Sequence, residues 1–179
     1  MKASWESAIA HVLAVEGGYV DRSDDRGGPT NFGVTWRTLS AWFQRPVAAS
    51  EVEHLDPGTA RLIYKDRFWD LMRGDELPIG VDLMVFDAAV HAGQGQATRW
   101  LQQAIGVEND GVFGSRTLTA ARAAPALETV RKIAFMRVLE SFDDPSDAPN
   151  TRGWVDRILK TLVEPVELST NQGWADNPP

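Results

Sequence analysis

Residues 4–18 read Ser-Trp-Glu-Ser-Ala-Ile-Ala-His-Val-Leu-Ala-Val-Glu-Gly-Gly. Their apolar side chains recur three and four positions apart, which is the period of an amphipathic helix. The members of this apolar stripe are Trp5, Ala8, Ile9, Val12 and Leu13. The two consecutive glycines end the helical pattern. The sequence therefore predicts a first helix over residues 4–16.

Glu16 occupies a position on this helix where a carboxylate is costly. It lies four residues after Val12 and seven after Ile9, so its side chain falls on the apolar stripe. It also belongs to the last helical turn, where the helix dipole is negative. Both features favour the protonated carboxyl that a general acid needs. The alternative, from the residues alone, is a structural anchor that bonds a nearby arginine or a loop amide.

The segment that follows, residues 19–34, is rich in Gly, Asp, Pro, Asn and Thr, which predicts a loop or a short irregular hairpin. Glycoside hydrolysis needs an acid on the leaving oxygen and a second carboxylate that activates water or stabilises positive charge. The candidates for that carboxylate are Asp21, Asp24 and Asp25. Three such acids also suit a solvated loop, and their spacing does not fit a calcium-binding loop. Thr30 and Asn31 could hold a water molecule.

Beyond this loop the patterns are helical and hardly any strand pattern occurs. Thr35 is a plausible N-cap for a helix through residue 43, and Asp56-Pro57 can begin a helix that runs to about residue 72. Further helices are predicted over residues 81–92, 98–105, 115–123, 126–142 and 153–163. The fold class expected from these patterns is mostly α.

The composition limits the classes of function. A chain of 179 residues, 43% of them hydrophobic, can form one well-buried core, or one core with a small lobe. The net charge of −7 makes nucleic acid and anionic membranes poor partners. Cysteine is absent, so no disulfide framework and no thiol nucleophile is expected. The three histidines lack the spacing of a zinc amidase, and we expect no metal and no cofactor.

The start of the chain bears on where the protein acts. It lacks a continuous apolar segment followed by a small-residue cleavage site, which is the pattern of a signal peptide. No apolar run approaches the length of a membrane span. We therefore expect a protein that is made in the cytoplasm without a signal peptide and does not insert into membranes.

Two blocks near the start of the chain resemble the signature of a known family. They are Glu16-Gly17-Gly18-Tyr19-Val20 and, after Asp25, Gly27-Gly28-Pro29-Thr30-Asn31-Phe32-Gly33-Val34-Thr35. Further matches are Trp69-Asp70, Phe86-Asp87-Ala88-Ala89-Val90, Leu101-Gln102-Gln103, Asp110-Gly111-Val112-Phe113-Gly114, and Gly153-Trp154 with Arg157. Over nearly its whole length the chain resembles glycoside hydrolase family 108, the lysozyme-like muramidases of phages, prophages and related elements.

This resemblance implies a lysozyme-like helical globule with a short irregular hairpin or loop after the first helix. It implies an endolysin-type muramidase that hydrolyses the β-1,4 bond between N-acetylmuramic acid and N-acetylglucosamine in bacterial peptidoglycan. Residues 1–90 would be the catalytic part, and residues 91–175 a helical peptidoglycan-binding-like part packed into the same globule. The expected partners are peptidoglycan glycan strands and a holin or other export partner that releases a monomeric enzyme to the periplasm and cell wall.

The resemblance also selects catalytic residues. In phage lysozymes an Asp follows the catalytic Glu by nine positions, which here is Asp25. The Thr usually follows that Asp by six positions, where this chain has Asn31, but the family block places a Thr at position 30. We therefore expect Glu16 to protonate the leaving oxygen and Asp25 to orient water or stabilise positive charge. Thr30 would help to place the water.

Four residues are expected to bind substrate: Tyr19, Asn31, Phe32 and His91. Tyr19 and Phe32 flank the catalytic loop, and aromatic rings can stack on sugars. His91 stands where family members often carry Asn, so its contact with the sugar would differ here. Two other functions fit the same residues. One is a lytic transglycosylase, which uses one carboxyl and the sugar's own hydroxyl, and the other is a wall-binding module without activity.

Overall fold

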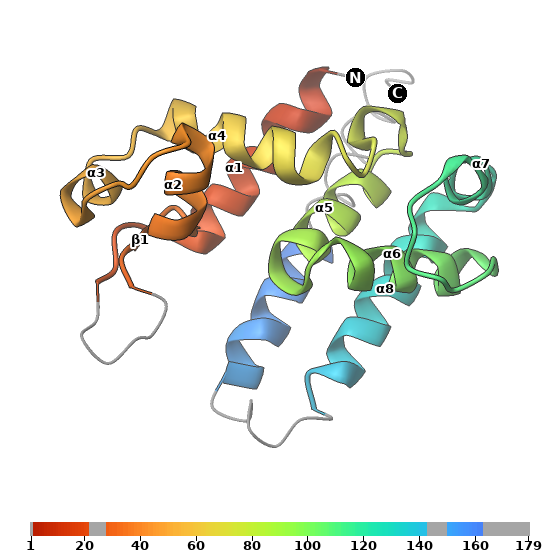
Figure 1. The fold of residues 1–179 in the computed structure, drawn as a ribbon. Helices are drawn as coiled ribbons and strands as arrows, with labels where there is room; N and C mark the ends of the chain where they lie inside the picture. The colour runs from red at the N-terminus through yellow and green to blue at the C-terminus, as the bar shows by residue number, and fades with distance from the viewer. Residues whose placement is uncertain (1, 22–27, 143–149, 163–179) are drawn as a thin grey trace, which may run out of the picture. The chain divides into compact units, whose positions relative to one another are not determined.

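The computed structural model describes residues 2–21, 28–142 and 150–162, and helices dominate them (Figure 1). The helices are α1 (Lys2–Glu16), α2 (Trp36–Phe43), α3 (Ala49–Glu53), α4 (Pro57–Tyr64), α5 (Val81–Ala92), α6 (Gln94–Ile105), α7 (Ser115–Ala123) and α8 (Ala126–Glu140), and residues 150–162 are also helical. Strands β1 (Thr30–Asn31) and β2 (Val34–Thr35) pair antiparallel. The prediction of a mostly α, lysozyme-like fold with a short hairpin after the first helix is confirmed.

The chain forms two compact units. The hairpin unit comprises the described residues of Ile9–Arg67, and the helical unit comprises those before Ile9 together with those from Phe68 onward. This division describes packing within the chain. The predicted division at residue 90 into a catalytic part and a wall-binding-like part concerns function, and it stays a prediction.

In the hairpin unit the helices begin where the sequence indicates. The Thr35 side chain accepts a hydrogen bond of 3.1 Å from the Thr38 backbone N–H and so caps α2. Asp56 caps α4 in the same way, accepting from the Thr59 backbone N–H at 3.0 Å, and Pro57 takes the first helical position. Both predicted N-caps are confirmed.

From α4 onward the structure differs in detail from the prediction. The helix expected to continue to residue 72 stops as α-helix at Tyr64, and a π-helical turn (Lys65–Trp69) and a 3₁₀ turn (Gly74–Glu76) follow. Leu62 of α4 is 59% exposed, because neighbouring helix positions point about 100° apart and Ile63 takes the buried one. His11 of α1 is buried.

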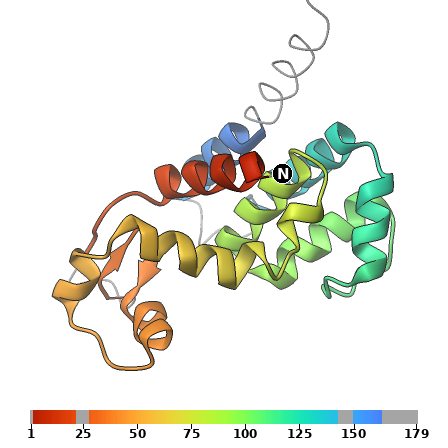
Figure 2. The same cartoon turned by 90° about the horizontal axis from the view of Figure 1, so that it is seen from above.

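The core of the helical unit is built around α5. This helix is mostly apolar, and its residues 81–89, including Asp82 and Asp87, are all buried, as is typical of a helix that runs through a core. Helices α6 and α8 pack against it (Figures 1 and 2). The rings of Trp5, Trp69 and Phe86 add an aromatic cluster with centroids 5.3–5.7 Å apart.

A buried charge cluster ties three helices of this unit together. Asp87 of α5 is fully buried and accepts hydrogen bonds of 2.8 Å from Arg137 of α8 and from Arg157 of the helical residues 150–162. Burial alone would raise the pKa of Asp87, but the two guanidinium groups outweigh it and hold the pKa below its ordinary value. The two guanidinium groups therefore stabilise the charged form of the Asp87 carboxylate.

The Asp-Gly motif at residues 110–111 forms a turn that a glutamine of α6 holds. The Gln102 amide donates to Asp110 Oδ1 at 2.7 Å and to the Val112 carbonyl at 3.1 Å, and it accepts from the Gly111 N–H at 2.9 Å. These contacts give the motif a role in folding. Among the described residues, no helix has both the length and the apolar character to cross a membrane.

Candidate active site

Glu16 is the last residue of α1, and its side chain is half-buried. Gly17 leaves the helix with a positive φ of 77°, a conformation that favours glycine. The chain then reaches Val20, which exchanges two backbone hydrogen bonds of 2.8 Å with Thr30. The predicted catalytic residues Glu16 and Thr30 thus belong to one unit, and the backbone of Thr30 is fixed by this bridge.

The turn of the hairpin lies directly against the Glu16 carboxyl. Phe32 and Gly33 join the paired residues Asn31 and Val34 with φ values of 50° and 71°, which is a type I′ turn. A Cβ on Gly33 would lie only 2.5 Å from Glu16 Oε2. Only glycine lets the backbone approach the carboxyl this closely.

Tyr64 of α4 reaches the same point, although sequence reasoning did not select it. Its hydroxyl donates a hydrogen bond of 2.8 Å to the Phe32 carbonyl, and the side chain is buried. The hydroxyl oxygen lies 2.5 Å from the position that a Cβ on Gly33 would occupy, as Glu16 Oε2 does. The available signal was a tyrosine on the core side of a helix, because a buried hydroxyl needs a partner.

Asn31, predicted to bind substrate, faces inward. It is 5% exposed, and its side-chain amide donates to the carbonyls of Val52 at 3.0 Å and Glu53 at 2.9 Å. Both hydrogens of the amide nitrogen are therefore used at the end of α3. The structure gives Asn31 the role of a clamp between β1 and α3, and its contact with substrate stays a prediction.

The two aromatic residues predicted to bind substrate, Tyr19 and Phe32, remain accessible. Tyr19 is 36% exposed, and its hydroxyl donates to Asp21 at 3.3 Å. Partial desolvation, with the carboxylates of Asp21 and Glu53, raises the pKa of Tyr19 above its ordinary value. Phe32 is half-buried in the turn. Asp25 lies outside the described residues, so its predicted role stays a prediction.

His91 belongs to the helical unit, whereas Glu16 belongs to the hairpin unit. Its half-buried ring meets the edge of Trp154, with centroids 5.2 Å apart. Burial, helped by the positive charges of Arg157 and Arg137 and opposed by Asp87, lowers the pKa of His91 to about 4. The imidazole is therefore neutral at pH 7 and can both donate and accept hydrogen bonds. Its predicted contact with sugar stays a prediction.

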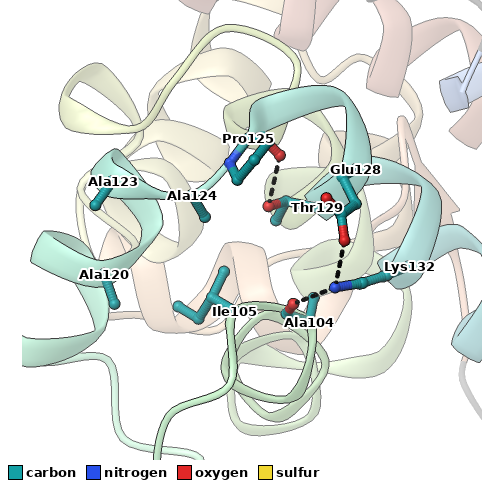
Figure 3. Close-up of a pocket in the computed structure, with 9 residues that line it drawn as sticks. All are labelled: Ala104, Ile105, Ala120, Ala123, Ala124, Pro125, Glu128, Thr129 and Lys132. Atoms are coloured by element: carbon teal, nitrogen blue, oxygen red, sulfur yellow. Dashed lines mark hydrogen bonds and ion pairs between the residues drawn. The ribbon is translucent and has the colours of Figure 1, made fainter.

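A cavity of about 390 Å³ lies in the helical unit, where α6 and α7 end and α8 begins (Figure 3). Its walls are mostly alanine, isoleucine and proline, and an ion pair of 2.7 Å between Lys132 and Glu128 stands at its edge. No residue predicted for the active site lines it. In the part of the chain that the structure describes, no cluster of three His, Asp or Glu side chains could hold a metal ion, and the expectation of no metal and no cofactor stays a prediction.

Comparison with known sequences and structures shows to which family this chain is related. The family model described as Glycosyl hydrolase 108 matches residues 9–93, which include the whole hairpin unit. The structure of Brucella abortus SagA is similar with a TM-score of 0.83 and 36% sequence identity, over 93% of this chain and 96% of the SagA chain. No curated protein sequence gives a significant match. The chain therefore belongs to glycoside hydrolase family 108, and its family and this neighbour support a peptidoglycan-hydrolysing glycosidase.

Proposed function

We propose that this glycosidase is a muramidase that hydrolyses the β-1,4 bond between N-acetylmuramic acid and N-acetylglucosamine. The observation that carries the proposal is the Glu16 carboxyl at the end of α1, which lies close against Gly33 in the hairpin turn. A general acid must be held in one place to deliver its proton to the glycosidic oxygen. In this role Glu16 protonates the leaving oxygen.

The second half of the reaction is assigned to the loop between α1 and β1. Asp25 is nine residues after Glu16 in the sequence, in the segment that the bridge between Val20 and Thr30 closes. In the proposed reaction water attacks the anomeric carbon and gives a proton to the Asp25 carboxylate, while the bond to the leaving oxygen breaks. Thr30 helps to place that water. The products are a new reducing end on muramic acid and a free hydroxyl on the leaving sugar.

The test of the acid is Glu16→Gln. This variant should fold like the wild type, as judged by thermal unfolding, and its rate on purified sacculi should fall at least about a hundredfold. Thr119→Ala, on the exposed side of α7, is the control for handling and folding. Wild-type activity in a folded Glu16→Gln variant would end the proposal.

Mass spectrometry of the digested peptidoglycan separates hydrolysis from transglycosylation. A hydrolase leaves reducing-end muramic acid, because water is the nucleophile. A lytic transglycosylase leaves a 1,6-anhydro ring, because the sugar's own hydroxyl attacks. We expect reducing ends and a large loss of rate in Asp25→Asn. Anhydro products together with an active Asp25→Asn variant would assign the enzyme to the transglycosylases and leave Glu16 as the acid.

For the biological setting we propose an endolysin of a phage, a prophage or a related element, supported by the resemblance to phage muramidases. The enzyme would be made in the cytoplasm, released by a holin or other export partner, and act on the wall as a monomer. Bacteria should tolerate expression of the untagged chain, whereas fusion to a secretory signal should lyse them. Rapid lysis by the untagged chain alone contradicts this route.

A further inference from the structure

We propose that Tyr64 is a positioning residue of this active site, whose hydroxyl holds the Phe32-Gly33 turn against the Glu16 carboxyl. The inference rests on the proposed function, because it takes Glu16 as the acid. Tyr64 lies in α4, 48 positions after Glu16 in the sequence, and both belong to the hairpin unit.

The first step of the argument concerns the backbone of the turn. Phe32 has a φ of 50°, in the left-handed region that a bulky side chain rarely adopts. A type I′ turn favours Asn, Asp or Gly at this position, so surrounding contacts must offset the strain at Phe32. The Tyr64 hydroxyl supplies such a contact by donating to the Phe32 carbonyl at 2.8 Å.

The second step concerns the point where the turn meets the carboxyl. Glu16 Oε2 and the Tyr64 hydroxyl oxygen each lie 2.5 Å from the place where a Cβ on Gly33 would stand. Both oxygens therefore lie against Gly33 at the same point. A shift of the turn would move the backbone of Gly33 relative to the Glu16 carboxyl. Tyr64 controls that shift through its hydrogen bond to the residue before Gly33.

The third step separates positioning from direct catalysis. Tyr64 is 3% exposed, so its ring and hydroxyl do not reach a sugar bound at the surface. Its hydroxyl carries one hydrogen, and the Phe32 carbonyl accepts it. We therefore infer that Tyr64 influences the reaction through Glu16 and the turn, not by touching the sugar. Small displacements of a catalytic group can lower a rate by about a hundredfold.

The test compares Tyr64→Phe with two matched variants. Tyr64→Phe keeps the ring and removes the hydroxyl, so kcat on labelled sacculi should fall by about 10- to 100-fold while KM stays within about twofold. Ile63→Val, a buried residue next to Tyr64 on α4, tests general loosening of the helix and should keep its kcat. Tyr19→Phe changes the other tyrosine, which is exposed, and should alter KM rather than kcat.

A second pair of variants tests the shared contact directly. Gly33→Ala places a Cβ against both oxygens and should lower kcat. In the double variant Gly33→Ala with Tyr64→Phe, one of these two oxygens is gone. The double variant should therefore be more active than the product of the two single effects predicts, whereas independent sites give simple multiplication. If Tyr64→Phe is unstable, Gly33→Ala alone still tests whether the contact matters for kcat.

Several outcomes overturn the proposal. A folded Tyr64→Phe variant with wild-type kcat does so, and so does an equal loss of kcat in Ile63→Val, which would show general loosening. Wild-type kcat in Gly33→Ala would show that the contact does not matter. If the proposed function itself is wrong, Glu16→Gln is active, whatever the activity of Tyr64→Phe.

Discussion

At the scale of single residues, Asp87 is the carboxylate whose loss should cost the most stability. It is fully buried between Arg137 and Arg157. Removing one partner of a buried ion pair leaves uncompensated charge in a medium that solvates it poorly. We expect Asp87→Asn to lower the free energy of unfolding by about 3–5 kcal/mol, measured by denaturant titration.

Glu128→Gln is the matched control for Asp87→Asn. It also removes one carboxylate from an ion pair, with Lys132 at 2.7 Å, but both of these side chains are more than half exposed. Exposed pairs contribute little, so no measurable change is expected. If the two variants lose similar stability, burial does not govern the strength of the Asp87 cluster.

His91 makes the fold sensitive to acid. Its pKa is about 4 in the folded chain against an ordinary value of 6.5. Below pH 6.5 the unfolded chain binds a proton at this residue and the folded chain does not, so stability falls as the pH drops from 6.5 to 4. The charged groups that act on His91 are Arg157 and Arg137, which lower its pKa, and Asp87, which raises it. His91→Gln should lose less stability than the wild type on acidification. An equal fall in melting temperature from pH 6.5 to 4 in the two proteins would show that His91 is not the cause of the acid sensitivity.

Asp82 has the opposite effect, because it lowers the stability of the fold as the pH rises. Burial raises its pKa to about 6 from 3.8, although the backbone N–H groups of Leu83 and Gly80 donate to its carboxylate at 2.8 and 2.7 Å. The stability that this group contributes is present below pH 3.8 and is lost as the pH rises through 6. Asp82→Asn keeps an acceptor oxygen and cannot ionise. Its melting temperature relative to wild type should therefore rise between pH 4 and 7, and a constant difference would show that Asp82 does not titrate there.

The residues of the site differ in how well the sequence predicts their roles. Glu16 could be selected because its carboxyl interrupts an apolar stripe. Asn31 was predicted to bind substrate, yet its amide donates to carbonyls more than twenty positions away. No local pattern indicates the role of Tyr64, because its partner Phe32 is 32 positions away in the sequence. Local chemistry is therefore predictable here, and contacts distant in the sequence are not.

At the scale of elements, capping can be measured at α2, which follows the hairpin directly. Thr35 ends β2 and caps α2 through its 3.1 Å bond from the Thr38 N–H. We expect Thr35→Ala to lower the free energy of unfolding by about 1 kcal/mol, because the N–H loses its acceptor. Thr119→Ala, within α7 and exposed, removes a threonine from a helix interior and should cost nothing. Equal effects in the two variants would mean that the cap contributes no stability.

Helices with a polar N-cap or a clear helical apolar period were predictable, and short elements with neither were not. Thr35 and Asp56 mark the beginnings of α2 and α4 because their side chains can satisfy a free N–H. The short helix α3 has no side-chain cap, and a single buried residue, Val52, faces the core. The π-helical turn after Tyr64 continues a helical pattern with a different hydrogen-bond spacing, which apolar periodicity does not reveal.

At the scale of the whole molecule, the net charge of −7 opposes approach to the cell wall. The stem peptides of peptidoglycan carry carboxylates, so an acidic enzyme and its substrate repel each other. Salt screens this repulsion: the screening length falls from about 30 Å at 0.01 M to about 8 Å at 0.15 M ionic strength. We expect the rate on intact sacculi to rise a few-fold over this range. The matched variant is Glu108→Lys, which reverses an exposed charge in the helical unit and should be faster at low salt and less dependent on salt. A rate that falls with salt in both proteins would show that attraction between charges governs binding to the wall.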